Sequence, residues 1–193
     1  MIRGPAAVIR FALTILCLLL PSLSNADLLR IAVASNFTHT LNTLLPEFEN
    51  DTGHDVEISS ASSGKLYAQI LHGAPFDVFL SADTDKPQQL AEQFPKIEST
   101  LFTYATGRLV YWCPKECEYP LSGISTMPAT LAIANPRLAP YGLAAKQTIE
   151  ALKVSTPTLV TGENIGQAYR FIESGHAQAG FIALSQALSL IHI

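Results

Sequence analysis

Short apolar runs that each end in a small polar turn recur along this chain, and a helical pattern follows each turn. The clearest run, Leu28–Ala34, has the continuous apolar character of a strand that is buried on both faces. The turns lie at Ser35-Asn36, Ser62-Ser63, Pro140-Tyr141 and Asn164-Ile165. This alternation predicts an α/β fold with parallel strands, arranged as two βαβ lobes that are joined by crossing strands.

Apolar runs bounded by turn residues predict seven strands. The segments are Leu28–Ala34, Val56–Ser59, Phe76–Leu80, Leu101–Trp112, Thr130–Ala134, Thr158–Thr161 and Ala179–Leu184. Gly107 interrupts the longest of them and marks the place where the chain is expected to cross between the lobes. Helices are expected after Asn36, from Ser62, after Asp83, from Tyr141 and from Asn164.

Composition and charge exclude two broad classes of protein. The chain is 48% hydrophobic and carries a net charge of only −4, so a mainly disordered chain is excluded. It has no basic run, which argues against a nucleic-acid-binding protein. An acidic chain does not attract an anion by long-range charge, so local dipoles would have to hold any anion that it binds.

The first residues have the pattern of a secretory signal peptide. Arg3 and Arg10 flank the start of the apolar run Ile9–Leu20, and Ser24-Asn25-Ala26 resembles a cleavage site. We therefore expect residues 1–26 to direct the chain to the periplasm. In that oxidising compartment Cys113 and Cys117 are predicted to form a local disulfide, with free thiols as the alternative.

The turns between strands and helices are the strongest candidates for a binding site. Ligands of open α/β sheets bind at the carboxyl ends of the strands, where helix N-termini offer unpaired N–H groups and a partial positive charge. Serine hydroxyls add further donors, so the pattern predicts an uncharged cage for a small, fully ionised oxyanion. The alternative is that Ser35, Ser63 and Asn164 are ordinary N-caps, each worth about 1 kcal/mol.

Four segments of the sequence resemble the periplasmic molybdate-binding proteins of ABC-type molybdate importers. They are Ala32–Phe37, Ser60–Leu66, Gly73–Asp83 and Gly180–Gln186. The stretch GAPFDVFLSAD within the third segment is the most specific, and the resemblance extends from Asp27 to about Leu188.

This resemblance implies a binding protein without enzymatic activity, cofactor or direct protein ligands to the metal atom. Molybdate or tungstate would be held through the hydroxyl and backbone of Ser35 and Ser63, with Asn36 beside them and backbone N–H groups from Tyr141 and Ile165. The expected partner is the membrane permease of an ABC importer, and the expected state is a monomer.

The resemblance also implies a two-lobed, type II periplasmic-binding-protein fold. Residues 27–104 would form the first lobe and residues 105–193 the second. Some family members place a tyrosine hydroxyl on the anion where this chain has Ala183, and the Ser35-Asn36 pair resembles the variant in which asparagine compensates. The ending Ser189–Ile193 does not resemble the family, so we expect the segment that returns to complete the first lobe to be missing.

Two other functions compete with this interpretation. Sulfate or phosphate is a possible alternative anion, but phosphate needs an acceptor such as Asp77 or Asp83, for which turn and capping roles are expected. A distant alternative is an exported serine hydrolase that uses Ser35 and His39, although the G-x-S-x-G motif is absent. Solvated surface roles are expected for Lys65 and Arg137, and helix-end positions for His54, His72 and His176.

Overall fold

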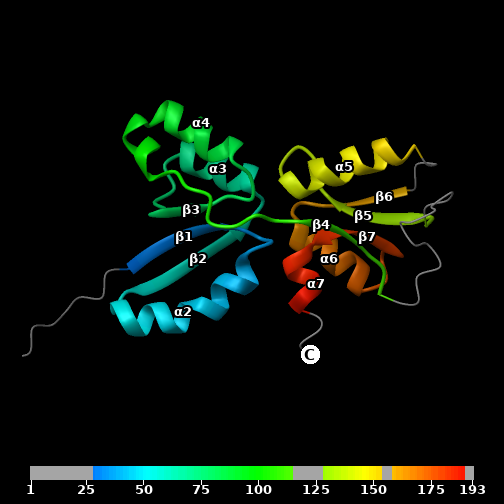
Figure 1. The fold of residues 1–193 in the computed structure, drawn as a ribbon, viewed down its shortest axis with the longest axis horizontal. Helices are drawn as coiled ribbons and strands as arrows, with labels where there is room; N and C mark the ends of the chain where they lie inside the picture. The colour runs from blue at the N-terminus through cyan, green and yellow to red at the C-terminus, as the bar shows by residue number, and fades with distance from the viewer. Residues whose placement is uncertain (1–27, 115–127, 154–157, 190–193) are drawn as a thin grey trace, which may run out of the picture.

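The computed structural model describes residues 28–114, 128–153 and 158–189, which form two β-sheets flanked by helices (Figure 1). The expected signal peptide and Cys117 lie outside these ranges, so the expected disulfide stays a prediction. Cys113 lies at the end of a strand, where its thiol donates to the Gln178 carbonyl across 3.8 Å. None of the helices in the described ranges is both long enough and apolar enough to cross a membrane.

The first sheet is entirely parallel, with the strand order β2-β1-β3. Its strands are β1 (Leu28–Ala34), β2 (Asp55–Ala61) and β3 (Val78–Leu80). The helices that accompany it are α2 (Thr38–Thr52), α3 (Ser63–Leu71) and α4 (Asp85–Gln93), followed by the 3₁₀ turn η1 (Pro95–Thr100). Helix α2 lies on one face of the sheet, and α3 and α4 lie on the other (Figure 1).

The alternation of side chains along β1 explains why both faces of this sheet are covered. Ile31 and Val33 pack with Leu41 of α2, whereas Ala32 packs with Leu66 of α3 on the opposite face. A central strand that is apolar on both faces cannot leave either face in water, which is why its sequence reads as a continuous apolar run.

The second sheet is mixed, with the strand order β4-β7-β5-β6, and only β4 is antiparallel to its neighbour. Its strands are β4 (Leu109–Trp112), β5 (Thr130–Ala134), β6 (Thr158–Gly162) and β7 (Ala179–Ala183). The helices are α5 (Pro140–Leu152), α6 (Ile165–Glu173) and α7 (Leu184–Ser189). The two sheets lie side by side, with α5 on one face of the second sheet and α6 on the other (Figure 1).

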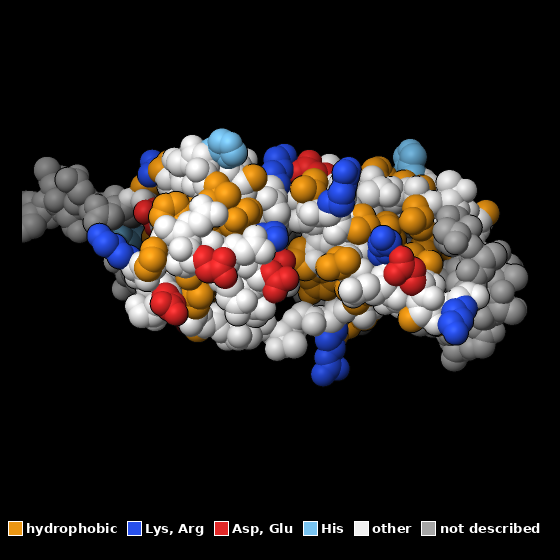
Figure 2. All heavy atoms as spheres, turned by 90° about the horizontal axis from the view of Figure 1, so that it is seen from above, with side chains coloured by type: hydrophobic (Ala, Val, Ile, Leu, Met, Phe, Trp, Pro, Cys, Tyr) orange, Lys and Arg blue, Asp and Glu red, His pale blue; other side chains and the backbone are white. Residues whose placement is uncertain are grey.

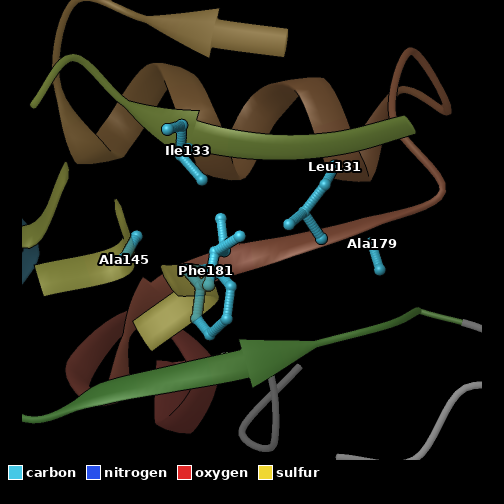
Figure 3. Packing of buried hydrophobic residues seen from close by; sticks show 6 residues of the cluster. Leu131, Ile133, Ala145, Ala179 and Phe181 are labelled. Atoms are coloured by element: carbon cyan, nitrogen blue, oxygen red, sulfur yellow. The ribbon is translucent and has the colours of Figure 1, made fainter. Parts of the chain in front are cut away.

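The core of the second sheet lies between β5, β7 and α5. Leu131 and Ile133 pack against Phe181 and Ala145 (Figure 3), whereas Ala132 faces α6 and packs with Ile172. This arrangement fixes the carboxyl ends of β5 and β7 next to the first turns of α5 and α6.

Strands β1 and β5 have the predicted bounds, but the predicted strand over Leu101–Trp112 is too long. Only Leu109–Trp112 forms a strand, because β7 is the partner and its pairing runs from Leu109 with Ala183 to Trp112 with Gly180. Beyond Ala183 the partner chain turns into α7, so residues before Leu109 find no strand beside them.

Candidate binding site between the two sheets

A small cavity lies at the junction of the two sheets, where strand ends meet helix beginnings. Its volume is about 10 Å³, roughly the room that one water molecule needs. The lining residues are Ala34, Ser35, Asn36, Ala61, Ser62, Ser63, Ala82, Ala139, Pro140, Tyr141 and Ile165. The structure therefore brings together all five of the predicted site residues, although they come from turns up to 130 positions apart.

Backbone donors converge on this cavity from four turns. Ser63, Tyr141 and Ile165 lie in the first turns of α3, α5 and α6, where N–H groups have no acceptor within the helix. Asn36 lies in the turn that precedes α2. Over the described ranges, none of these four N–H groups donates to a backbone or side-chain acceptor. Three helix N-termini therefore place their partial positive charge at one point.

The hydroxyl of Ser63 is buried and has its proton available. Ser63 is only 1% exposed, and its Oγ accepts a hydrogen bond of 2.9 Å from the Ala82 N–H. A hydroxyl that accepts one bond can still donate its proton to a ligand. Ser63 is the first helical residue and Ser62 occupies the N-cap position, so the N-cap interpretation of Ser63 is wrong.

The hydroxyl of Ser35 connects the two sheets. Its Oγ accepts a long hydrogen bond of 3.4 Å from the Gly166 N–H in α6, 131 residues away. Phe37, not Ser35, is the N-cap residue of α2, so the N-cap interpretation is wrong here too. The N-cap interpretation is confirmed for Asn164, whose side-chain oxygen accepts from the Gln167 N–H at 3.1 Å.

Asn36 and Tyr141 face each other inside the site. Burial raises the pKa of Tyr141 above its ordinary value, and a hydrogen bond with the Asn36 side chain partly offsets this rise. The phenol is therefore neutral at physiological pH. The Asn36 Oδ1 atom is buried and has no hydrogen-bond partner among the described residues. A Cβ atom at Gly107 would collide with the Tyr141 hydroxyl, so the backbone at Gly107 lies directly against this side chain.

Ser62 and Tyr104 belong to the site or its surroundings and were not predicted from the sequence. Ser62 lines the cavity and is 2% exposed. The Tyr104 hydroxyl donates to the Ser81 carbonyl at 2.8 Å, and burial together with the neighbouring Tyr141 raises its pKa to about 12. The Ser62-Ser63 pair was a visible signal for the first residue, whereas no local pattern marks Tyr104.

Direct contacts hold the two sides of the site together. The Gly64 N–H donates to the Leu138 carbonyl at 2.9 Å, and the Ser185 hydroxyl donates to the Asn36 carbonyl at 2.8 Å. Ala183, at the position where some family members have tyrosine, packs among the apolar residues around Tyr141 and supplies no hydroxyl.

The charged side chains nearest in sequence to the site serve other roles than lining the cavity. None of the lining residues in the described ranges is acidic or basic. The Asp83 carboxylate accepts from the Lys86 N–H at 3.1 Å in the first turn of α4, which confirms a capping role. The Asp77 carboxylate instead accepts from the backbone N–H of Arg30 in β1 at 2.8 Å, so it links two neighbouring strands and neither caps a helix nor closes a turn. On the face shown in Figure 2, basic and acidic side chains are interspersed rather than gathered into a basic surface.

The residues of the serine hydrolase alternative do not come together in the described part of the chain. His39 is exposed on the surface of α2 and forms no side-chain hydrogen bond with Ser35 in the structure described. Within the same ranges, no three His, Cys, Asp or Glu side chains come together as a metal site. The unpaired polar groups of the site are neutral and, apart from the Asn36 Oδ1 atom, can donate, which suits the binding of an anion.

Comparisons with known proteins agree with the fold. Residues 29–192 match the family described as bacterial extracellular solute-binding protein. The molybdate-binding protein ModA of Azotobacter vinelandii is 41% identical over 174 residues, which cover 87% of this chain and 69% of that protein. ModA of Rhodobacter capsulatus is 41% identical over 162 residues, covering 81% of this chain and 64% of that protein.

A solved structure of a molybdate-binding protein is also similar to this chain. The periplasmic molybdate-binding protein of Azotobacter vinelandii superposes with a TM-score of 0.67 at 38% identity, over 81% of this chain and 71% of that one. The chain thus spans about two thirds of the length of the relatives that it matches.

Proposed function

The chain belongs to the bacterial extracellular solute-binding proteins, among the relatives of molybdate-binding protein ModA, and on this premise we propose that it captures molybdate or tungstate in the cavity between its two sheets. The observation that carries the proposal is the convergence of four backbone N–H groups and buried serine hydroxyls on one cavity; among the described residues these N–H groups have no acceptor and no charged side chain lines the cavity. The proposed ligand-binding residues are Ser35, Asn36, Ser63, Tyr141 and Ile165.

The donor set selects a dianion that carries no proton. Molybdate and tungstate carry no proton at neutral pH, whereas phosphate carries one or two. None of the described residues that line the cavity is a carboxylate that could accept such a proton, and the Asn36 Oδ1 atom is occupied once it accepts from the Tyr141 hydroxyl. An unpaired buried donor costs about 1–3 kcal/mol. Sulfate also carries no proton at neutral pH, but it is smaller than molybdate, so rigidly placed donors would lie too far from its oxygens.

The Asn36 amide can serve such an anion by rotation. Its Oδ1 is buried without a partner, and its two amide ends are nearly identical in shape. With the amide turned over, Nδ2 would donate to the anion and Oδ1 would accept from the Tyr141 hydroxyl. Both polar ends would then be paired.

Entry of the ligand requires the two sides to separate. A cavity of about 10 Å³ holds a water molecule, and a tetrahedral oxyanion is larger. The long bond between Gly166 and Ser35 is the contact that the anion would replace, because its oxygens can accept from both groups. The same contacts can re-form around the bound anion and close the site.

The cellular role follows from the family. We expect the protein to act outside the cytoplasm as a monomer, in the periplasm after removal of residues 1–26, and to deliver the anion to the permease of an ABC importer. The lobe boundary between residues 104 and 105 is part of this proposal.

A titration of the purified protein tests the proposal. Calorimetry with molybdate, tungstate, sulfate and phosphate should give similar affinities for the first two, weaker binding of sulfate and the weakest binding of phosphate. The single tryptophan, Trp112, stacks on Tyr169 of α6 with ring centroids 5.2 Å apart, so its fluorescence gives an independent signal. Displacement of molybdate by phosphate or sulfate at equal concentration would overturn the assignment.

A further inference from the structure

Ser62 is a buried polar side chain with no hydrogen-bond partner among the described residues. It is 2% exposed, and no hydrogen bond reaches its Oγ from the part of the chain that the structure describes. A buried hydroxyl without a partner lowers stability, so its presence calls for a compensating role.

The ordinary role of a serine at this position is not fulfilled. Ser62 is the N-cap residue of α3, where its Oγ would normally accept from an N–H group two or three residues later. No such bond forms, and the nearest candidate donor, the Gly64 N–H, is bound to the Leu138 carbonyl at 2.9 Å. The contact between the two sides of the site therefore occupies a donor that would have paired with Ser62.

The place of Ser62 indicates what its hydroxyl pairs with. It lines the same cavity as Ser35 and Ser63, whose hydroxyls accept from protein N–H groups and keep their protons for a ligand. We infer that Ser62 donates a further hydrogen bond to the bound oxyanion and helps to determine which anion the site accepts.

This inference rests on the proposed function and makes it more specific. With Ser62 the cavity presents three hydroxyls beside the four unpaired N–H groups. Each oxygen of a tetrahedral oxyanion has several lone pairs, so four oxygens can accept from all of these donors. An anion with fewer oxygens would leave some of them unpaired, at a cost in affinity.

The test compares molybdate affinity and thermal stability in four forms of the full chain. The wild type, Ser62→Ala, Ser62→Cys and the control Ser59→Ala are titrated by calorimetry. Ser59 lies on β2, the strand that ends just before Ser62, and it is not among the residues that line the cavity. We expect Ser62→Ala to raise the Kd by about tenfold to a hundredfold, the effect of losing a hydrogen bond to a charged group.

Stability without ligand separates this role from capping. Because the Ser62 side chain makes no hydrogen bond with any residue that the structure describes, Ser62→Ala should not lower the melting temperature of the unliganded form. Ser62→Cys keeps the shape with a weaker donor, so its Kd should lie between those of the wild type and Ser62→Ala. Ser59→Ala should bind as the wild type does.

Three results would overturn the inference in distinguishable ways. If the wild type binds molybdate and both Ser62 variants bind it equally well, Ser62 is not a ligand residue and the proposed function stands. A lower melting temperature with an unchanged Kd would instead identify a cap. If the wild type binds none of the four oxyanions, the proposed function fails and the role of Ser62 fails with it.

Discussion

Lys65 Nζ lies 2.9 Å from Glu163 Oε1, and this ion pair joins α3 on one side of the site to the turn before α6 on the other. Both side chains are partly exposed, at 49% and 35%. The charge of Lys65 is thus directed to a carboxylate and not to the cavity. The pair adds to the backbone bond between Gly64 and Leu138 that also spans the junction.

Removal of either charge of this pair should change ligand affinity little. Partly exposed ion pairs contribute about 0.2–1 kcal/mol, so Lys65→Met and Glu163→Gln should each shift the Kd for molybdate by less than about fivefold. Calorimetry at low and high salt measures the effect. A loss of more than tenfold in Lys65→Met alone would show that Lys65 contacts the anion directly.

Loss of the predicted hydroxyl donors should weaken binding much more. Each of Ser35→Ala and Ser63→Ala removes a hydrogen bond to a charged ligand, so we expect affinity for molybdate to fall by about 1.5–3 kcal/mol. Ser63→Ala also leaves the Ala82 N–H without its acceptor, so the free energy of unfolding should fall by about 1–2 kcal/mol. Calorimetry and urea unfolding measure the two quantities.

Ser60→Ala is the matched control for this pair. The Ser60 hydroxyl bonds to Thr38 at 2.7 Å on the surface and does not line the cavity. Ser60→Ala should therefore leave the Kd for molybdate unchanged. Equal affinities in Ser35→Ala, Ser63→Ala and the control would mean that these hydroxyls have only a structural role.

The fold was predictable because its buried strands are continuous apolar runs that end in turns. Strands β1 and β5 are central and covered on both faces, and their predicted bounds are those observed. The strand predicted over Leu101–Trp112 failed for a tertiary reason, because its partner β7 ends at Ala183. Local apolar character does not reveal where a partner strand ends.

The site was predictable at its turns but not in its long-range contacts. The five predicted residues were recognised from turn chemistry and family resemblance, and all of them line one cavity. No sequence signal indicates that the Gly166 N–H donates to the Ser35 hydroxyl. Nor does any signal indicate that the Gly64 N–H donates to the Leu138 carbonyl and is therefore not available to Ser62. Those contacts depend on how the two sheets are placed, which a periodic pattern does not encode.

Gly64→Ala should separate helix stability from ligand binding. Gly64 lies within α3, where alanine is favoured over glycine by about 1 kcal/mol, so the helix itself should gain. A Cβ atom there would lie 2.9 Å from the Leu138 carbonyl oxygen, which is too close. The neighbour is backbone from the other side of the site, so the two sides must move apart and molybdate should bind more weakly.

Calorimetry and small-angle scattering check this prediction. The Kd should rise, and the radius of gyration with molybdate should stay larger than that of the liganded wild type. Gln69→Ala, an exposed change on the same helix, should alter neither. Wild-type affinity in Gly64→Ala would mean that the bond to Leu138 is not needed for the bound state.

Alkaline pH should destabilise the protein through Tyr104. Its pKa is raised to about 12 by burial and by Tyr141, whereas tyrosine in the unfolded chain titrates near 10. Above pH 10 the unfolded chain therefore loses a proton that the folded protein keeps. The free energy of unfolding should be insensitive to this group below about pH 9 and should fall as the pH rises from 10 to 12.

Tyr104→Phe tests this linkage by urea unfolding at pH 8 and pH 11. At pH 8 the variant should be less stable by about 1 kcal/mol, because the Ser81 carbonyl loses its donor at 2.8 Å. Between pH 8 and pH 11 it should lose less stability than the wild type, since the titrating group is gone. Some loss should remain, because the pKa of Tyr169 is also raised to about 12 by burial and by its hydrogen bond to Glu173. An equal loss in both proteins would show that Tyr104 titrates alike in the folded and unfolded chains.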